Sequence, residues 1–373
     1  QEVEGIEVLA NTSVVGWYTG NWLAAVGASN GAERLYKIRA GAVVVATGTY
    51  DLPAVFSDND LPGVMLGSAV RRLIALYGVI PGERAVVVAA NDDGWSLATQ
   101  LLAVGVEVVA LAEERSSGEV PAEQRTAVEQ AGVAIHYGHT IVAAKGSAAV
   151  DAAVLGSVES QVEAQVEVAC DFIVVSTASA PANELVLMAG GRGRFEESRG
   201  WMADCPEAMY TAGRCNGHDD VETQMADGRR AGLEAAQFAA GPPPQVSADG
   251  EEAPSPTRSD MTGCRQPPRS GKGKRFVCYC EDVLDGDLET AMQEGFTSME
   301  LVKRYTTVSM GPCQGRMCSA NAIELCARAQ NKPVQEMGRT TSRPPVVPVS
   351  LGALAGQRME PRQLSPLHGW HTE

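Results

Sequence analysis

The residues whose types and spacing most clearly predict chemistry are four cysteines in the last third of the chain. The protein has nine cysteines, and four of them form two close pairs, Cys278-x-Cys280 and Cys313-x4-Cys318. Two pairs of thiolates could bracket a [2Fe-2S] cluster, with each pair ligating one iron. No secretory signal is visible, so this spacing favours metal or redox chemistry over structural disulfides.

Two other interpretations of these thiols stay open. Zinc also accepts four thiolates, but structural zinc sites favour about two to four residues between paired ligands, and one residue separates Cys278 from Cys280. Alternatively, the cysteines hold no metal, because a cysteine is often simply a small buried hydrophobe. Cys326, eight residues after Cys318, falls near one face of an expected helix and is predicted to lie in the core.

A second candidate site is the turn after an expected strand at 84–90. A dinucleotide fingerprint places three glycines so that the backbone can turn, approach a pyrophosphate and pack the helix closely. Here those positions are Ala89, Asn91 and Gly94. Glu113 ends the next expected strand, where an acidic residue could accept a hydrogen bond from a ribose hydroxyl.

This turn allows two interpretations. It is either a nicotinamide dinucleotide site or a Rossmann unit kept for its architecture, with the Ala89 methyl and the Asn91 side chain partly closing the pocket. Asp92 and Asp93 follow directly. Their negative charge stands where phosphates would sit, which argues against the pyrophosphate.

A third candidate combines two short motifs at the ends of two further expected strands. Thr47-Gly48 precedes the unit around 84–113, and Gly213 follows it. Together they suggest a flavoprotein-like nest in which an outer dinucleotide fold is interrupted by an inner one. Gly213 is followed by Arg214 and not by the Asp that usually holds a flavin ribityl chain, so we do not expect a standard flavin site. We expect the chain to begin after the glycine-rich unit that would open the outer fold.

The fold class that positions these sites is α/β. Strand and helix patterns alternate, which predicts parallel strands joined by right-handed crossovers. The predicted strands are 41–48 (buried and central), 84–90, 106–112, short strands within 150–168, 171–177 and 207–213, with a hairpin near 26–32; the predicted helices are 68–77, 97–104, 121–131 and 221–239. Nested dinucleotide-binding domains of Rossmann type are thus followed by a small helical cysteine-containing domain.

The expected domain organisation follows from these patterns and from a break in them after residue 240. The Pro-rich and basic stretch there lacks apolar periodicity, which indicates a flexible linker. The expected parts are a partial outer dinucleotide-binding domain (1–80), an inserted NAD-type domain (81–177), the return of the outer domain (178–240), the linker (241–275), the cysteine module (276–330) and a Pro-rich tail (331–373).

Composition excludes several functions. The net charge is −16, with 30 basic and 46 acidic side chains, and so acidic a chain is a poor partner for nucleic acid. No apolar run approaches the roughly 18 residues of a membrane-spanning helix, so we expect no membrane contact and a cytoplasmic location. The five histidines are scattered along the chain, and no catalytic residue is predicted; they are His136, His139, His218, His368 and His371.

Several segments resemble the alpha subunit of heterotetrameric sarcosine oxidase. The cysteine module is also similar to bacterioferritin-associated ferredoxin domains, which occur in alpha subunits of proline, opine and cyanide-forming glycine dehydrogenases. The segments that carry the resemblance are 58–66, 89–94, 276–283, 301–318, 340–345 and 348–356.

The resemblance implies a complex in which a flavin-binding beta subunit oxidises sarcosine or a related secondary amino acid, beside smaller subunits. The alpha subunit would bind NAD, share FAD or FMN with its partners and help enclose the route of the product to folate. Relative to that family both ends look truncated, because neither an opening glycine fingerprint nor a C-terminal aminomethyltransferase-like domain is visible. The family does not decide whether the thiols hold iron and sulfur.

Three hypotheses follow. The chain is a cofactor-binding subunit of a sarcosine oxidase type complex, which the segments around Cys313 and at 351–356 favour. Alternatively, it is a [2Fe-2S] electron-transfer subunit of a proline, opine or glycine dehydrogenase. A third possibility is a noncatalytic scaffold. Under the first hypothesis the isolated chain does not oxidise sarcosine.

Overall fold

A computed structural model describes residues 5–29, 32–159, 165–196, 200–240, 273–355 and 365–373. Most of the expected linker, at 241–272, and part of the expected tail, at 356–364, lie outside the described residues. Among the described helices, none has the length and apolar content needed to cross a membrane.

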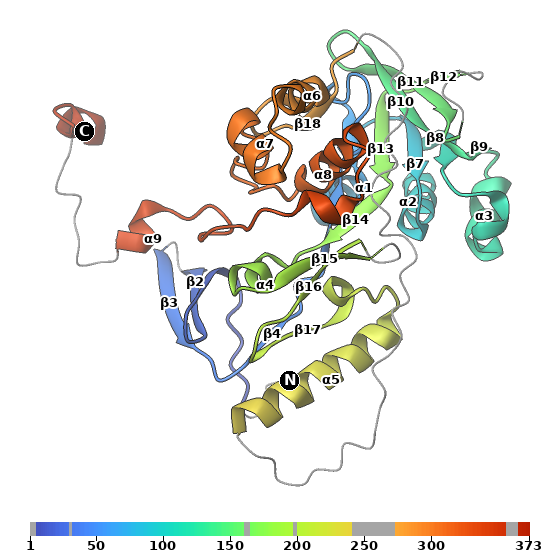
Figure 1. The fold of residues 1–373 in the computed structure, drawn as a ribbon. Coiled ribbons are helices and arrows are strands. Elements are labelled where there is room, and N and C mark those ends of the chain that lie inside the picture. The colour runs from blue at the N-terminus through green and yellow to red at the C-terminus, as the bar shows by residue number, and fades with distance from the viewer. Residues whose placement is uncertain (1–4, 30–31, 160–164, 197–199, 241–272, 356–364) are drawn as a thin grey trace.

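The inner unit is built on a five-stranded parallel sheet with helices against one face (Figure 1). Its two central strands are made almost entirely of Val, Ile and Ala and are buried, as expected for parallel strands covered on both sides. The predicted parallel crossover between 84–90 and 106–112 is confirmed. In spatial order the strands are β6 (Val64–Leu66), β13 (Phe172–Ser176), β7 (Arg84–Ala89), β8 (Glu107–Glu113) and β9 (Ala134–Tyr137).

Two hydrophobic layers enclose this sheet. On the helical side, Trp95 and Leu101 belong to the buried cluster beneath α1 (Gly67–Tyr77), α2 (Asp92–Ala103) and α3 (Ala122–Gln130). On the other side, Phe56 shares a buried cluster with Ile141 and Leu155, which belong to an antiparallel sheet. That sheet contains β10 (His139–Gly146), β11 (Val150–Ser157) and β12 (Val166–Ala169).

The helix ends follow local chemistry. α1 ends at Gly78 as predicted, with φ = 63°, and the Gly78 N–H bonds to the Ile74 carbonyl. The prediction for α2 was wrong at its start, because the helix begins at Asp92 and not at 97. The Asn91 side chain caps it by accepting from the Gly94 N–H at 3.1 Å. An Asn cap followed by acidic residues in the first turn is a strong helix start.

The outer unit is smaller and contains the long helix α5 (Val221–Ala240). The predicted buried central strand at 41–48 is the three-residue strand β4 (Val43–Val45), whose one partner in the described part of the chain is the parallel strand β17 (Met209–Thr211). Val44 is 39% exposed, so this strand is neither fully buried nor flanked on both sides. The predicted helix over 221–239 is confirmed.

Short pairs of strands connect the outer and inner units. The chain leaves the outer unit along β5 (Thr49–Leu52) and returns along β14 (Ala178–Pro181), which pair antiparallel. The returning segment then forms α4 (Glu184–Met188), the pair β15 (Arg192–Glu196) and β16 (Gly200–Asp204), and the 3-10 turn η2 (Gly213–Asn216) after β17.

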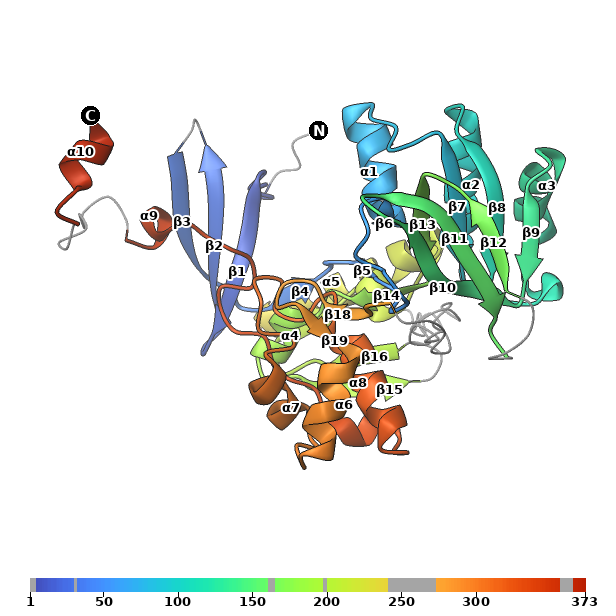
Figure 2. The ribbon, with the colours of Figure 1, turned by 90° about the horizontal axis from the view of Figure 1, so that it is seen from above.

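The N-terminal residues form a separate antiparallel sheet. Strands β1 (Thr12–Tyr18), β2 (Trp22–Ser29) and β3 (Ala32–Arg39) are neighbours in that order. The predicted hairpin is confirmed, because Ser29 pairs with Ala32 across a two-residue connection. This sheet and the inner unit lie at opposite ends of the molecule (Figure 2).

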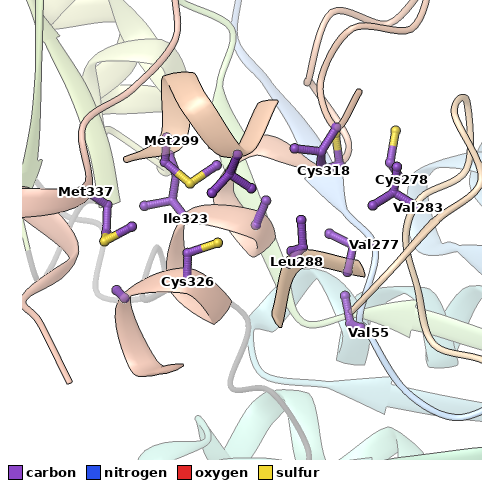
Figure 3. Close-up of a cluster of buried hydrophobic side chains, with 14 of the residues drawn as sticks. Val55, Val277, Cys278, Val283, Leu288, Met299, Cys318, Ile323, Cys326 and Met337 are labelled. Atoms are coloured by element: carbon purple, nitrogen blue, oxygen red, sulfur yellow. The ribbon is translucent and has the colours of Figure 1, made fainter. Parts of the chain in front are cut away.

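The cysteine module is mainly helical, as predicted. Its buried cluster includes Leu288, Val302, Ile323 and Met337, together with Cys326, whose predicted core position is confirmed (Figure 3). The elements are β18 (Phe276–Cys278), β19 (Val283–Leu284), α6 (Asp285–Gln293), α7 (Met299–Thr306), α8 (Ser319–Ala329) and the 3-10 helix η3 (Val334–Met337), followed by α9 (Leu351–Ala355) and α10 (His368–Thr372).

The module is bonded to the loop that precedes β6. The Asn321 side chain donates to the Pro53 carbonyl at 2.7 Å, from a position that is 0% exposed. Asn59 both donates to and accepts from the Phe276 backbone, each at 2.9 Å. These buried hydrogen bonds fix the thiol-bearing segment against the dinucleotide units.

Candidate dinucleotide and thiol sites

The turn after β7 brings three predicted site residues together. Asn91 Oδ1 accepts from the Gly94 N–H at 3.1 Å and from Ser176 Oγ at 3.2 Å. A Cβ at Gly94 would stand 2.6 Å from the Cβ of Ala89. Gly94 therefore serves the close packing of α2 against β7, which is the architectural part of the dinucleotide fingerprint.

Glu113 does not occupy the position expected of a ribose ligand. Its side chain is 0% exposed, and it accepts from Trp95 Nε1 at 2.5 Å. It also accepts from the Arg115 backbone N–H at 2.9 Å and from the Arg115 guanidinium at 3.0 Å. Burial alone would lower the pKa of Arg115, but its hydrogen bonds to Glu113 and Asp92 raise that pKa. Both Glu113 oxygens are thus engaged inside the protein.

The positive end of α2 is neutralised by the chain itself. Asp92 and Asp93 lie in its first turn. The Asp92 carboxylate lies 2.9 Å from Arg115 Nη1, and the Asp93 carboxylate lies 3.0 Å from Arg214 Nη2 and 3.8 Å from Arg71 Nη1. A pyrophosphate would have to compete with two carboxylates that already use the helix dipole. This geometry favours the architectural interpretation of the inner unit.

The carboxyl edge of the outer unit brings the other predicted residues together. Val45 of β4 pairs with Thr211 of β17 in parallel register, so Thr47-Gly48 and Gly213 follow at the same end of the two strands. Gly48 has φ = +72°, and no other atom lies within 4 Å of a Cβ built there. Thr47 is exposed, and its hydroxyl donates to the Ala182 carbonyl at 2.5 Å.

A buried carboxylate that sequence reasoning missed shapes this edge. Asp227 of α5 is 1% exposed. It accepts from the Gly213 N–H at 2.8 Å, from Asn216 Nδ2 at 3.1 Å and from Arg230 Nη2 at 2.7 Å, and lies 3.6 Å from His218 Nε2. The sequence offers only an Asp three residues before an Arg on a helix, which is an ordinary surface pair. The long-range bond to Gly213 could not be predicted from it.

The four predicted thiols do converge, but in a different pairing from the expected one. Cys278 and Cys318 are 1% and 0% exposed and lie beside each other at one edge of the buried cluster (Figure 3). Their side chains are hydrogen-bonded. The second pair joins Cys280, which is exposed, to Cys313, which is half-buried. Each pair therefore takes one cysteine from each sequence motif.

The two buried thiols have different protonation preferences. The hydrogen bond from Cys318 lowers the pKa of Cys278 to about 6, although burial opposes this, and backbone bonds from Glu281, Ser309 and Cys280 act in the same direction. The same Cys278–Cys318 hydrogen bond, together with burial, raises the pKa of Cys318. Cys278 is the thiolate of the pair and Cys318 its proton donor.

The described thiols show no preformed metal cage. In the described parts of the chain, no group of three or more His, Cys, Asp or Glu side chains is arranged to hold a metal ion. The expected assignment of Cys278 and Cys280 to one iron, and of Cys313 and Cys318 to the other, is not the pairing observed.

A mostly apolar cavity of about 390 Å³ lies next to the thiols. Most of its lining comes from residues within 53–66, with Ala69 of α1 and Val175 of β13, and the cysteine module contributes Tyr279 and Met317. Tyr279 separates Cys278 from Cys280, and Met317 precedes Cys318. Sequence reasoning missed this cavity because its lining comes from segments more than 200 residues apart in the chain.

The parallel inner sheet, its antiparallel cover and the paired carboxyl edges define an α/β fold of nested dinucleotide-binding domains. The solved structure of L-proline dehydrogenase from P. horikoshii has this fold, with a TM-score of 0.65 and 19% sequence identity. The match covers 92% of this chain and 64% of that chain. The predicted fold class is therefore confirmed.

The sequence comparisons are more specific. Residues 272–358 match the family model described as sarcosine oxidase A3 domain. The chain is 31% identical to sarcosine oxidase subunit alpha of Rhizobium meliloti, over 99% of this chain and 38% of the relative, and 30% identical to that of Corynebacterium sp. strain P-1, over 97% and 40%. The resemblance to sarcosine oxidase alpha subunits is confirmed along nearly the whole chain, which spans about two fifths of their length.

Proposed function

We propose that this chain is a cofactor-binding part of a multi-subunit oxidoreductase that oxidises sarcosine or a related secondary amino acid. The single observation that carries the proposal is the unbroken similarity to sarcosine oxidase alpha subunits through both the dinucleotide units and the cysteine module. The amine would be oxidised at a flavin held by a partner subunit, with FAD or FMN shared at the contact between subunits. A cytoplasmic location stays a prediction.

Within this proposal the dinucleotide, NAD, belongs at the outer carboxyl edge and not at the inner one. Three features support that choice: the open space at Gly48, the exposed Thr47, and the bond that holds Gly213 to Asp227. The inner edge offers two carboxylates where the pyrophosphate would lie. A bound nicotinamide would supply a hydride acceptor. The role of the chain's own residues there is to let the backbone approach the ligand closely.

Calorimetric titration of the full chain with NAD tests this placement. Gly48→Ala should weaken NAD binding at least tenfold, because a methyl group would enter the space that the backbone leaves open. Gly78→Ala is the matched control: Gly78 has φ = +63°, has the same empty surroundings and caps α1 away from the site. Both variants pay a similar penalty for a non-glycine residue at positive φ. Equal loss of binding in both variants, or in neither, would contradict the placement.

A separate experiment tests which subunit oxidises the amine. The purified chain should show no sarcosine turnover alone, and co-purification from the native source should recover a flavoprotein subunit with it. Turnover by the purified chain without any partner would contradict the assignment of the reaction to another subunit. Recovery of the chain alone, with no flavoprotein, would contradict the proposed complex.

A further inference from the structure

A polar pocket of the cysteine module is not used by the proposed function. It has a volume of about 600 Å³ and lies between α7, the turn that follows α7 and the segment 340–348. We propose that this pocket binds the terminal phosphate of a small molecule. The proposal depends on two basic and three hydroxyl side chains that line the pocket, namely Lys303, Arg343, Thr340, Thr341 and Ser342.

The charge of this pocket is opposite in sign to that of the whole chain. The chain has a net charge of −16, but three cations and one anion line the pocket, which gives it a net charge of +2. One of the cations, Arg304, is already paired with the anion, Glu300, at 2.8 Å. Within the described residues, the side chains of Lys303 and Arg343 have no partner. Two uncompensated cations therefore line the same space, which favours an anionic ligand.

The two cations come from different parts of the chain. Lys303 lies in the last turn of α7, where a basic residue also offsets the helix dipole, so it does not by itself indicate a ligand. Arg343 belongs to no helix, and its convergence with Lys303 has no such explanation. A guanidinium offers a fork of N–H donors and an ammonium a compact charge, and both are common ligands of phosphate oxygens.

The segment that carries Arg343 is fixed at two points. Gln314 Oε1 accepts from the Arg343 backbone N–H at 2.8 Å, and Gln314 Nε2 donates to the Pro345 carbonyl at 2.5 Å. The Val346 N–H donates to the Val15 carbonyl of β1 at 2.8 Å. The segment thus joins the cysteine module to the N-terminal sheet, and α9 beyond it lies beside β3 (Figure 1). A backbone fixed in advance lowers the entropic cost of binding a ligand.

The hydroxyl groups and the size of the pocket favour a phosphate monoester. Thr340, Thr341 and Ser342 directly precede Arg343, and within the described residues their hydroxyl groups are not hydrogen-bonded. A phosphate monoester carries a charge of about −1.5 to −2 at neutral pH, which matches two cations. The volume of the pocket falls in the range of roughly 300–1,000 Å³ that is typical of sites for small organic molecules. The phosphates of NAD are diesters, so this site is separate from the NAD placement proposed above.

Calorimetric titration of the full chain in a phosphate-free buffer tests the proposal with three probes. Ribose 5-phosphate should bind, and ribose should bind at least about tenfold more weakly, because it lacks the charge-assisted hydrogen bonds of the phosphate. Inorganic phosphate should compete with ribose 5-phosphate. Tighter binding of ribose 5-phosphate than of inorganic phosphate would identify the ligand as an ester, and equal affinities would identify it as the free ion.

Variants locate the binding site. Arg343→Gln and Lys303→Gln should each weaken the binding of ribose 5-phosphate by about tenfold, since each removes one charge-assisted contact. Lys303→Arg keeps the charge and should keep most of the affinity. Lys332→Gln is the matched control, because it removes the same charge from an exposed residue of the same part of the chain that does not line the pocket. Its affinity should equal that of the parent.

Two further measurements make the result interpretable. Thermal unfolding of each variant should match that of the parent, because the substituted side chains have no partners among the described residues. Gly48→Ala, which tests the NAD placement, should leave the binding of ribose 5-phosphate unchanged, so the two proposals can fail independently.

Three results would overturn the proposal. The first is equal affinity for ribose and ribose 5-phosphate, and the second is no detectable binding of either phosphate probe. The third is an equal loss of affinity in Arg343→Gln and Lys332→Gln, which would show that the phosphate responds only to the overall charge of the chain.

Discussion

The guanidinium of Arg214 lies 3.0 Å from the carboxylate of Asp93, and this ion pair joins the turn after β17 in the outer unit to the first turn of α2 in the inner unit. Arg214 follows Gly213, at the position where flavoproteins of this class usually place an Asp for the ribityl chain. Here the residue at that position neutralises a carboxylate of the neighbouring unit. The outer edge and the inner edge are therefore electrostatically linked.

This link predicts a measurable coupling between the two units. The Arg214 and Asp93 side chains are 35% and 46% exposed, so solvent screens the pair and we expect about 0.5–1 kcal/mol of coupling. A double-mutant cycle with Arg214→Gln and Asp93→Asn, followed by urea unfolding, measures it. The coupling should shrink between about 0.05 M and 0.5 M salt.

The exposed pair Arg84–Glu107, which joins β7 and β8 inside one unit, is the reference for this cycle. Its coupling should be of similar size and similarly sensitive to salt. A coupling near zero for Arg214–Asp93, beside a measurable one for Arg84–Glu107, would contradict the link between the units.

Much of the fold could be predicted because its signals are local. Val-rich apolar runs within 84–90 and 171–177 predict buried parallel strands, and both lie at the centre of the inner sheet. Gly78 predicts a helix end because only a residue that tolerates positive φ closes the helix there. Each of these features depends on residues that are close together in the sequence.

The candidate sites were harder to predict because they depend on contacts across the chain. Spacing places Cys278 beside Cys280 in the sequence, but the fold pairs Cys278 with Cys318. Glu113 stands at the expected strand end, yet Trp95 and Arg115 enclose it. The periodicity of the sequence does not reveal which donor on another helix or strand will hydrogen-bond to a given carboxylate. The predicted residues could be read from the sequence, but their partners, Asp227 among them, could not.

The enclosed carboxylate leads to a second prediction. Glu113→Gln should destabilise the protein by about 2–4 kcal/mol, because it leaves the guanidinium of Arg115, which is 16% exposed, without its buried counterion. Glu107→Gln on the same strand is the control, since Glu107 is 65% exposed and its loss should cost no more than about 1 kcal/mol. Denaturant unfolding compares the two. Equal effects would mean that Glu113 is not a structural centre of the inner unit.

Packing at the β7–α2 turn gives a third prediction. Gly94→Ala should cost about 1–3 kcal/mol, because the added methyl group would stand 2.6 Å from the Cβ of Ala89 and the helix must shift. Gly232→Ala in α5 introduces the same change where no atom lies within 4 Å, and it should stabilise the chain by about 0.5–1 kcal/mol. Thermal unfolding should therefore move in opposite directions for the two variants. If Gly94→Ala left the stability unchanged, the turn would have space for the added methyl group, and the prediction would be wrong.

The last prediction concerns pH. Burial raises the pKa of Glu324 from 4.5 to about 7, although its ion pair with Arg328 at 3.1 Å opposes the shift. The folded protein then holds a proton that the unfolded chain releases above about pH 4.5, so stability should fall as pH rises from about 4.5 to 7 and change little beyond. Glu324→Gln removes the cost of ionising this carboxyl in the folded protein. Because the Glu324 side chain is 22% exposed, we expect the variant to be more stable than the parent by on the order of 2 kcal/mol at pH 8. The two proteins should converge near pH 4.5. Urea unfolding at both pH values measures this, and parallel stability curves for the two proteins would contradict it.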